Sequence, residues 1–203
     1  PFMYLNEGYC TPRDGQREFS PLEMRLEVFT ALAAGAKSLQ WYPAHGSRGL
    51  LKHPAMWNAV GETNGELHQL LPLLSIGTPI GEPLVDNENI LARTILCGDR
   101  ALVVVLVNKN YTSTPENFEI EAVEQATVRV RVPTIFKAAG VAVPDFPGAP
   151  HDIDCHINPT TVSFDLSFDA AQAAIIYSDT SVLKAMQSIH EDCMARYEPM
   201  PDE

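Results

Sequence analysis

The sequence predicts a mixed fold in which an α/β region is followed by an antiparallel all-β region. Up to about residue 82, short apolar runs alternate with amphipathic helical patterns. Near Pro83 the hydrophobic period changes from about 3.6 residues to about 2, the spacing of strands with one buried face. Turn residues then separate a series of short alternating runs, which is typical of a β-sandwich. Successive strand–helix units imply parallel strands in the first region.

The first strand and the first helix are predicted in residues 1–35. Residues 2–6 are a short apolar run that ends at Glu7 and Gly8. Ser20 has the position of an N-cap, with Pro21 at the first helical position and Glu23 closing a capping box. The predicted apolar face of this helix consists of Leu22, Leu26, Phe29, Leu32 and Ala33. Gly35 is the glycine expected to end the helix.

The second unit is a short run at residues 39–42 and a long helical pattern at residues 54–74. Gly61 and Gly65 interrupt this helix, each costing up to about 1 kcal/mol against alanine, so we expect a neighbour to pack closely there. Two parallel strands cannot form a buried sheet alone, because such sheets need both faces covered. We therefore expect residues 1–82 to be the end of a larger (β/α) domain.

The β-rich region is predicted at residues 83–180, after a linker that contains Pro79, Gly81 and Pro83. Predicted strands at 90–97 and 101–107 form a hairpin around Gly98. The other predicted strands are residues 118–123, 127–132, 154–157, 161–168 and 173–177. Residues 181–203 are expected to hold a short helix, at 182–197, and a frayed end from position 198.

The composition argues against two classes of partner. The chain of 203 residues has 26 acidic and 14 basic side chains and a formal net charge of −12. Nucleic acids and anionic membrane surfaces both need clustered Lys and Arg, so we expect neither as a partner. No apolar run approaches the roughly 20 residues that span a bilayer. The cellular location is left open, with secretion or export to the periplasm as one option.

The four cysteines, Cys10, Cys97, Cys155 and Cys193, have no metal-like spacing, and we expect neither a metal nor a cofactor. Cys97 and Cys155 both fall in the β-rich region. A disulfide between them therefore stands as an alternative to free buried thiols.

Several segments resemble the C-terminal end of a (β/α)8-barrel glycoside hydrolase of the retaining type. The matching segments are Tyr4-Leu5-Asn6-Glu7-Gly8-Tyr9, Ser-Pro-Leu-Glu-Met-Arg at 20–25, Ala-Leu-Ala-Ala-Gly-Ala-Lys-Ser at 31–38, Gln40-Trp41-Tyr42, Met56-Trp57, Glu66-Leu67-His68 and the run at 101–108. The resemblance extends to about Ser178. It implies the last two β/α units of a TIM barrel (1–82), an antiparallel β-sandwich (83–180) and a C-terminal helix or tail (181–203). The implied function is hydrolysis of glycosidic bonds.

The resemblance also implies that Glu7 is the catalytic nucleophile. Residues 2–6 and 40–42 would be the seventh and eighth barrel strands, and barrel enzymes place their chemistry at the carboxyl ends of strands. A retaining glycosidase needs two carboxyl groups roughly 5 Å apart. The acid/base partner would lie on the fourth strand, outside this chain. The Asn6-Glu7 dipeptide is more typical of the acid/base residue, but its position favours the nucleophile, and we give position more weight.

Five further residues are candidate contacts for a carbohydrate substrate: Trp41, Tyr42, His45, Arg48 and Tyr9. Trp41 could stack on a sugar ring, or it could belong to the core, since Trp is usually largely buried. His45 and Arg48 follow the eighth strand and could hydrogen-bond hydroxyls, or they could lie on the surface. Glu7 itself could be a solvated loop carboxylate.

Two other functions remain open. A degenerate barrel of the same build would bind glycans or act as a scaffold without catalysis. A free-standing α/β interaction module would take its missing strands from a partner chain. In each case the missing barrel portion or the partner chain is expected to pair with the strands of residues 1–82.

Overall fold

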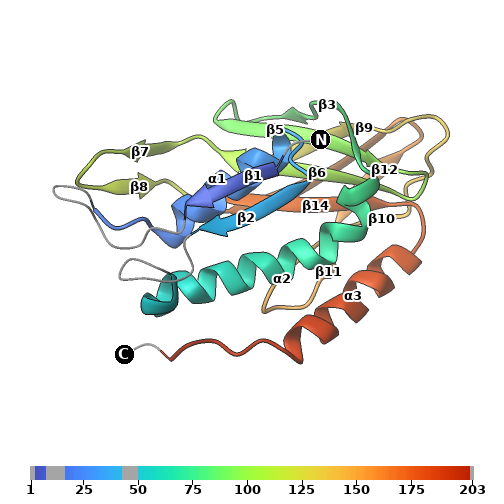
Figure 1. Cartoon of the computed structure of the whole chain (residues 1–203). Helices are drawn as coiled ribbons and strands as arrows, with labels where there is room; N and C mark the ends of the chain where they lie inside the picture. Colours follow the sequence, from blue (N-terminus) through green and yellow to red (C-terminus); the bar gives the residue numbers. More distant parts are fainter. Residues whose placement is uncertain (1–2, 8–16, 43–49, 202–203) are drawn as a thin grey trace.

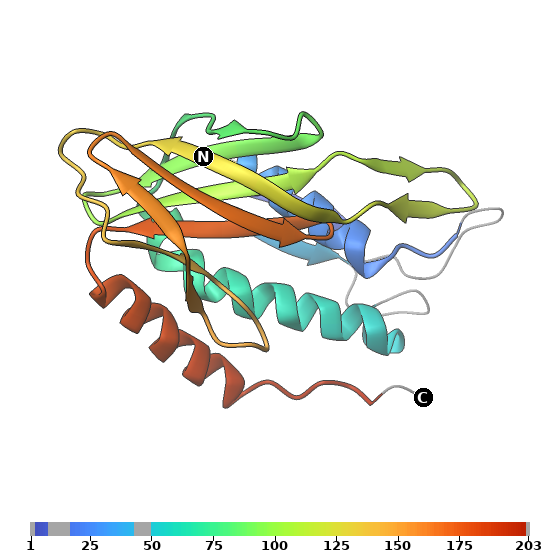
Figure 2. The same cartoon turned by 180° about the vertical axis from the view of Figure 1, so that it is seen from behind.

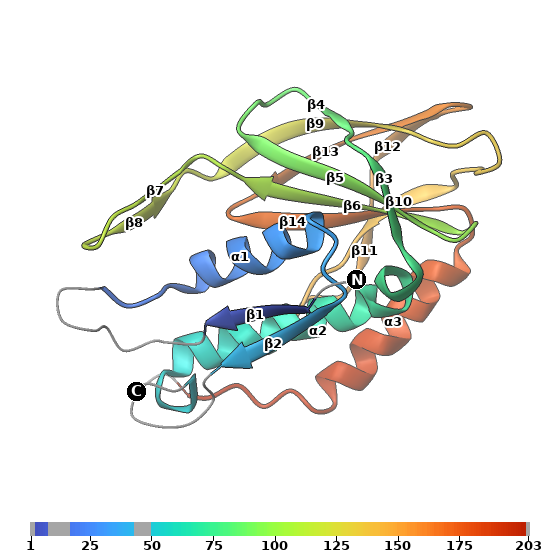
Figure 3. The same cartoon turned by 45° about the horizontal axis from the view of Figure 1, so that its top comes forward.

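The computed structural model describes residues 3–7, 17–42 and 50–201 of the chain (Figure 1). The elements form layers, which Figure 3 shows edge-on. A four-stranded sheet covers one face of a six-stranded sheet, and three helices with a two-stranded parallel sheet lie on its other side. The fold is therefore mixed, with helices on one side of an antiparallel sandwich.

The first region has the predicted order of strand, helix, strand and helix. Its elements are β1 (Met3–Glu7), α1 (Pro21–Ala33), β2 (Ser38–Tyr42), the short 3-10 helix η1 (Leu50–Lys52) and α2 (Pro54–Ile76). β1 and β2 pair in parallel, as successive strand–helix units require. Within the described residues, no other strand joins this pair.

The predicted capping box of α1 is present. The Glu23 amide donates to Ser20 Oγ at 3.2 Å, and the Ser20 amide donates to Glu23 Oε2 at 3.0 Å. Gly35 follows the C-cap with a φ of 93°, a conformation that suits glycine because it has no Cβ. The predicted buried face needs one correction. Leu22 is exposed, whereas Met24 and Val28 are buried.

The second region is an antiparallel sandwich. Its strands are β3 (Thr78–Gly81), β4 (Leu84–Val85), β5 (Ile90–Cys97), β6 (Ala101–Asn108), β7 (Tyr111–Ser113), β8 (Phe118–Ile120), β9 (Val123–Arg131), β10 (Gly140–Val143), β11 (His151–Ile153), β12 (Cys155–Asn158), β13 (Thr161–Phe168) and β14 (Ala171–Tyr177). The six-stranded sheet has the order β11-β10-β14-β6-β5-β3 and the four-stranded sheet β12-β13-β9-β4. β7 and β8 form a separate hairpin.

The six-stranded sheet is buried on both faces, so the protein has two apolar cores. In β6, the side chains of Val103 and Val105 pack against the helices, while those of Leu102, Val104 and Leu106 pack against the four-stranded sheet. All eight residues of β6 are consequently buried. The four-stranded sheet is buried on one face only, as the strict alternation along β9 and β13 predicts.

Three predictions for the β-rich region are wrong in detail. Residues 78–81 are not a linker but β3, which tolerates Pro79 because it lies at the edge of its sheet. The predicted strand 118–123 is divided between β8 and β9. The short strands β4, β7, β10 and β11 were not predicted, because runs of two to four residues are too short to show a period.

The third region is α3 (Ser181–Met194) and an extended segment after it. α3 packs against α2, on the side away from α1 (Figures 1 and 3). The cysteines Cys97, Cys155 and Cys193 are free thiols, so the alternative of a Cys97–Cys155 disulfide is wrong. Cys97 lies in the core beside the helices, and Cys155 packs against the core between the sheets. None of the helices in the described part of the chain is long and apolar enough to span a membrane.

Candidate active site

The candidate active site is the edge at which β1 and β2 both end. Their register places the main chain of Glu7 opposite that of Tyr42, so the two carboxyl ends are side by side. The chain leaves each strand at this edge and returns through a helix, α1 after β1 and α2 after β2 (Figure 3). In (β/α) folds this is the edge that carries catalytic groups.

The predicted site residues are placed to different extents. Glu7 and Tyr42 are placed by their main chain at the ends of β1 and β2. Tyr9, His45 and Arg48 lie outside the described residues. The catalytic role of Glu7 and the sugar-binding roles of the other residues stay predictions.

Trp41 is the one predicted sugar contact whose surroundings are described. Its side chain is half-buried against the helical core, and its Nε1 donates a hydrogen bond to Asn64 Oδ1 of α2 at 3.2 Å. Leu39, two residues earlier, packs against the same core, whereas Ser38 and Gln40 are exposed on the other face of the strand. These contacts favour the core role for Trp41 over the sugar-stacking role.

Hydrogen bonds at two points of α2 hold β2 and the residue before it against this helix. Near the middle of α2, Asn64 holds Trp41. At its C-terminus, Lys37 Nζ donates to the carbonyl oxygens of Leu74 and Gly77, at 2.6 and 2.5 Å, and so satisfies groups that the helix leaves unpaired. A pocket of about 200 Å³ remains between these two points, lined by apolar side chains of both elements.

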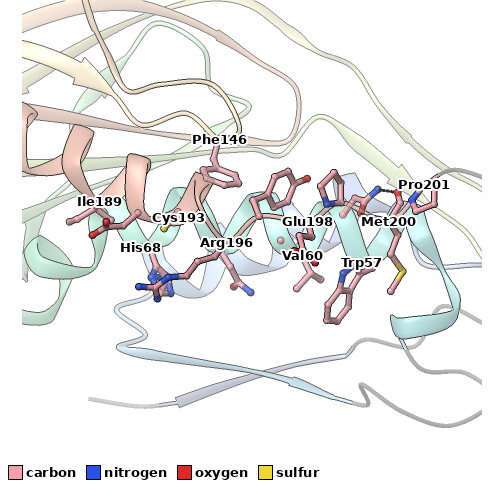
Figure 4. A pocket seen from close by; sticks show the side chains of 17 residues that line it. Trp57, Val60, His68, Phe146, Ile189, Cys193, Arg196, Glu198, Met200 and Pro201 are labelled. Carbon is pink, nitrogen blue, oxygen red and sulfur yellow. Dashed lines mark hydrogen bonds between the residues drawn. The ribbon is translucent and has the colours of Figure 1, made fainter.

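A larger groove, of about 880 Å³, lies between α2 and α3. Figure 4 shows Trp57 and Met200 at one end of this α2–α3 groove and His68 and Ile189 at the other. Charged side chains of both signs, Asp192, Arg196 and Glu198, also line it. Its walls therefore offer hydrogen-bond donors and acceptors beside an aromatic ring.

One wall of the groove is the extended segment at residues 197–201, which we call the strap. The Asn58 amide group donates to the Met200 carbonyl at 2.9 Å and accepts from the Met200 amide at 2.7 Å. The Tyr197 hydroxyl donates to Glu62 Oε1 at 3.2 Å, and the Tyr197 ring meets Phe146 edge-on at 5.0 Å between centroids. The prediction of a frayed C-terminal end is therefore wrong for the strap, because α2 supplies it with partners.

The residues of this groove were not predicted as functional, but one sequence signal points to it. Gly61 and Gly65, one turn apart on α2, were expected to allow close packing of a neighbour. A Cβ at Gly61 would lie 3.1 Å from the Tyr197 ring, and a Cβ at Gly65 would lie 2.4 Å from the Phe146 ring. That expectation is confirmed, although the sequence does not say which neighbours approach.

Among the residues that the structure describes, no group of three or more His, Cys, Asp or Glu side chains could hold a metal ion.

Comparisons with known proteins give only a coarse similarity. No family model and no curated protein matches the sequence. In its fold the chain is similar to a glycoside hydrolase family 30 subfamily 8 xylanase, Xyn30A, from Clostridium acetobutylicum. The TM-score is 0.47, the sequence identity is 11%, and the match covers 87% of this chain but only 42% of the xylanase. At these values the likeness does not extend to activity.

Proposed function

We propose that this chain is the C-terminal part of a retaining glycoside hydrolase, formed by the last two β/α units of a barrel and an accessory β-sandwich. The observation that carries the proposal is the parallel register of β1 and β2, which ends with Glu7 opposite Tyr42. A carboxylate at the carboxyl end of a parallel strand has the position at which barrel enzymes carry out their chemistry.

In the proposed mechanism, Glu7 attacks the anomeric carbon of the substrate as the glycosidic bond breaks. The second carboxyl group, supplied by a part of the protein outside this chain, protonates the departing oxygen. Water then hydrolyses the resulting ester, and the second group takes the proton from that water. Tyr42, Tyr9, His45 and Arg48 are the proposed contacts to sugar hydroxyls, whereas Trp41 supports the end of β2.

The proposed partner of β1 and β2 is the remainder of the barrel. In the described structure the two strands pair only with each other, so their outer edges leave backbone donors and acceptors available for further strands. We expect the chain expressed alone to associate through these edges. A monodisperse monomer in sedimentation, with a single cooperative unfolding transition, would contradict this expectation.

The test of the proposed function is a substitution of Glu7 in the complete protein. Glu7→Gln keeps the shape of the side chain but cannot form the covalent ester, so turnover of activated aryl glycosides should fall to a few per cent of the wild type or less. An activated fluoro-glycoside that traps the intermediate should label the peptide that contains Glu7, as detected by mass spectrometry.

The matched control is Glu88→Gln, which makes the same change at an exposed position of the sandwich and should leave turnover as it is. If Glu7→Gln keeps substantial turnover, Glu7 is not the nucleophile. If the wild-type protein binds oligosaccharides but hydrolyses none of the glycosides, the non-catalytic degenerate barrel becomes the better proposal.

A further inference from the structure

The β7–β8 hairpin extends from the sandwich on the same side of the molecule as the carboxyl ends of β1 and β2 (Figures 2 and 3). Residues 111–117 are all exposed, whereas Ile120, at the end of β8, packs against the core beside the helices. Tyr111 is 45% exposed as a residue, and its ring lies 5.8 Å from the Phe118 ring, at an angle of 35°. The exposed hairpin therefore carries two aromatic rings that contact each other.

The hairpin is attached to the segment that follows β1, and the attachment is made by Arg17. The Arg17 amide donates to the Pro115 carbonyl at 3.0 Å. Its Nε donates to the Thr114 carbonyl at 3.1 Å, and its Nη2 donates to Ser113 Oγ at 3.1 Å. The guanidinium group also lies over the Phe118 ring, 5.6 Å from the centroid. One residue thus binds the turn and both strands of the hairpin.

Arg17 is held in turn by α1. Its two terminal nitrogens donate to the two oxygens of Glu23, each at 2.5 Å, and Glu23 is the buried residue of the capping box. Bidentate Arg–carboxylate pairs are strong and directional. The hydrogen bonds that Arg17 donates to Glu23 are the main cause of the raised pKa of Arg17. The hairpin, the segment after β1 and the start of α1 therefore form one hydrogen-bonded unit.

The place of this unit in the fold defines its role. Arg17 lies in the connection from the carboxyl end of β1 to α1, and such connections surround the active site of (β/α) folds. We propose that the β7–β8 hairpin is a wall of the substrate cleft, that Tyr111 is its contact for a carbohydrate ring, and that Arg17 is the positioning residue that holds this wall. This inference rests on the proposed function.

The chemistry of the hairpin fits a neutral carbohydrate chain. A tyrosine ring with one exposed face can pack on the apolar face of a sugar ring, and its hydroxyl can donate to a sugar oxygen. Thr112, Asn117 and Glu119 are exposed on the same hairpin and add donors and acceptors. Asn117 Nδ2 donates to Glu119 Oε1 at 2.7 Å, which orients both groups. A long substrate would reach these residues, whereas a small aryl glycoside would not.

The first arm of the test measures whether Arg17 holds the hairpin, and it does not depend on activity. In the complete protein, Arg17→Met removes the guanidinium group and keeps an unbranched side chain. We expect backbone amides of the hairpin to exchange hydrogen several-fold faster in this variant. The matched control is Ser20→Ala, which removes a bond within the capping box but none of the Arg17–hairpin contacts. Equal exchange in wild type and Arg17→Met would overturn the positioning role.

The second arm measures carbohydrate binding. We expect Tyr111→Ala and Arg17→Met to raise KM for oligosaccharides several-fold, with a smaller change in kcat, because the hairpin binds substrate away from the reacting bond. Tyr111→Phe keeps the ring and should lie close to the wild type. Calorimetric titration of the Glu7→Gln protein with linear xylo-, gluco- and manno-oligosaccharides gives binding without turnover.

The outcomes separate this inference from the proposed function. If the protein hydrolyses oligosaccharides and Tyr111→Ala leaves KM unchanged, the hairpin is not a cleft wall, and the proposed function still holds. If the protein neither binds nor hydrolyses any oligosaccharide, both fail. If Tyr111→Ala instead abolishes association between copies of the protein and has no effect on oligosaccharides, the hairpin is a protein-binding element and the carbohydrate role is overturned.

Discussion

The half-buried Arg25 of α1 and the buried Glu66 of α2 form an ion pair, with 2.7 Å between Nη1 and Oε2. Arg25 Nε also donates to the Ala171 carbonyl of β14 at 2.9 Å, and the guanidinium group lies 4.6 Å from the centroid of the Phe29 ring. One side chain thus connects both helices of the α/β region to the six-stranded sheet. Since the surrounding core is apolar, this contact fixes how the helices sit on the sheet.

The ion pair makes stability depend on pH in a definite direction. Burial raises the pKa of Glu66 above its ordinary 4.5, and the nearby charge of Arg25 opposes that rise. An acid whose pKa is raised by folding contributes stability below its unfolded pKa and loses that contribution as the pH rises through its folded pKa. Without Arg25, the pKa of Glu66 should rise further.

We therefore predict that Arg25→Met destabilises the protein by about 3 to 5 kcal/mol at neutral pH, because it leaves a buried carboxylate unpaired. The loss should shrink towards about pH 4, where Glu66 is protonated. Urea denaturation at both pH values measures the two effects. The double variant Arg25→Met with Glu66→Met should recover most of the stability, since apolar side chains replace the whole pair. An equal loss at both pH values would show that packing, and not charge, is the cause.

The sequence predicts the local structure of this protein well, because the signals are carried by neighbouring residues. The capping box of Ser20 and Glu23, the glycine after α1 and the hairpin at Gly98 are all confirmed. The alternation in β13 and the packing of the sandwich on the helices are confirmed too. Each of these features depends on a hydrophobic period or on a residue with a special backbone preference.

What could not be predicted depends on residues far apart in the chain. Arg25 and Glu66 are 41 positions apart, and Arg17 and Thr114 are 97 apart. No period or motif identifies such partners. The strap was missed for the same reason: an extended segment rich in proline resembles a free tail until Asn58 of α2 is placed beside it. The assignment of Glu7 as the nucleophile rests on a resemblance. The structure places only the main chain of Glu7, opposite Tyr42.

The close approach of α2 to Phe146 predicts an unusual cost for a glycine-to-alanine substitution. In a helix, Gly65→Ala should gain up to about 1 kcal/mol from helix propensity. Its Cβ would lie 2.4 Å from the buried Phe146 ring, however, and overpacking of this kind costs about 1 to 3 kcal/mol. We predict a net destabilisation of about 1 to 2 kcal/mol, measured by urea denaturation.

Gly61→Ala is the matched control for this prediction. Its Cβ would lie 3.1 Å from the ring of Tyr197, which belongs to the strap and can move aside. The destabilisation should therefore be smaller than at Gly65. Phe146→Leu should partly rescue Gly65→Ala. A Gly65→Ala protein more stable than the wild type would contradict the packing described here.

Tyr177 predicts a second dependence on pH, at the alkaline end. Burial, and then the hydrogen bond from its hydroxyl to Asp152 Oδ1 at 2.8 Å, raise the pKa of Tyr177 from 10.0 to about 12. A group whose pKa is raised by folding stabilises the protein below its unfolded pKa and loses that effect as the pH rises through its folded pKa. The contribution of Tyr177 should be constant below about pH 10 and disappear towards about pH 12.

Two measurements check this prediction. Near-ultraviolet absorbance should show a late step of tyrosine ionisation, and the amplitude of this step should be smaller in Tyr177→Phe. Chemical denaturation should show a wild-type stability that falls more steeply than that of Tyr177→Phe as the pH rises above about 10. Parallel curves for the two proteins would mean that burial and the hydrogen bond to Asp152 do not raise the pKa of Tyr177 in solution.

The strap gives the last prediction, because Asn58 makes two of the three hydrogen bonds described above that attach the strap to α2. Asn58→Ala removes both hydrogen bonds to Met200, and we expect the strap to detach with a loss of at most a few kcal/mol in global stability. Trp57 lines the groove that the strap encloses, and Trp41 is the only other tryptophan of the chain. In a Trp41→Phe background, release of the strap should therefore shift the emission of Trp57 towards the red.

Asn64→Ala in a Trp57→Phe background is the mirror control, since Asn64 holds Trp41 and has no hydrogen bond to the strap in the described structure. If Asn58→Ala leaves the emission of Trp57 unchanged while Asn64→Ala shifts that of Trp41, the strap is held by contacts other than Asn58.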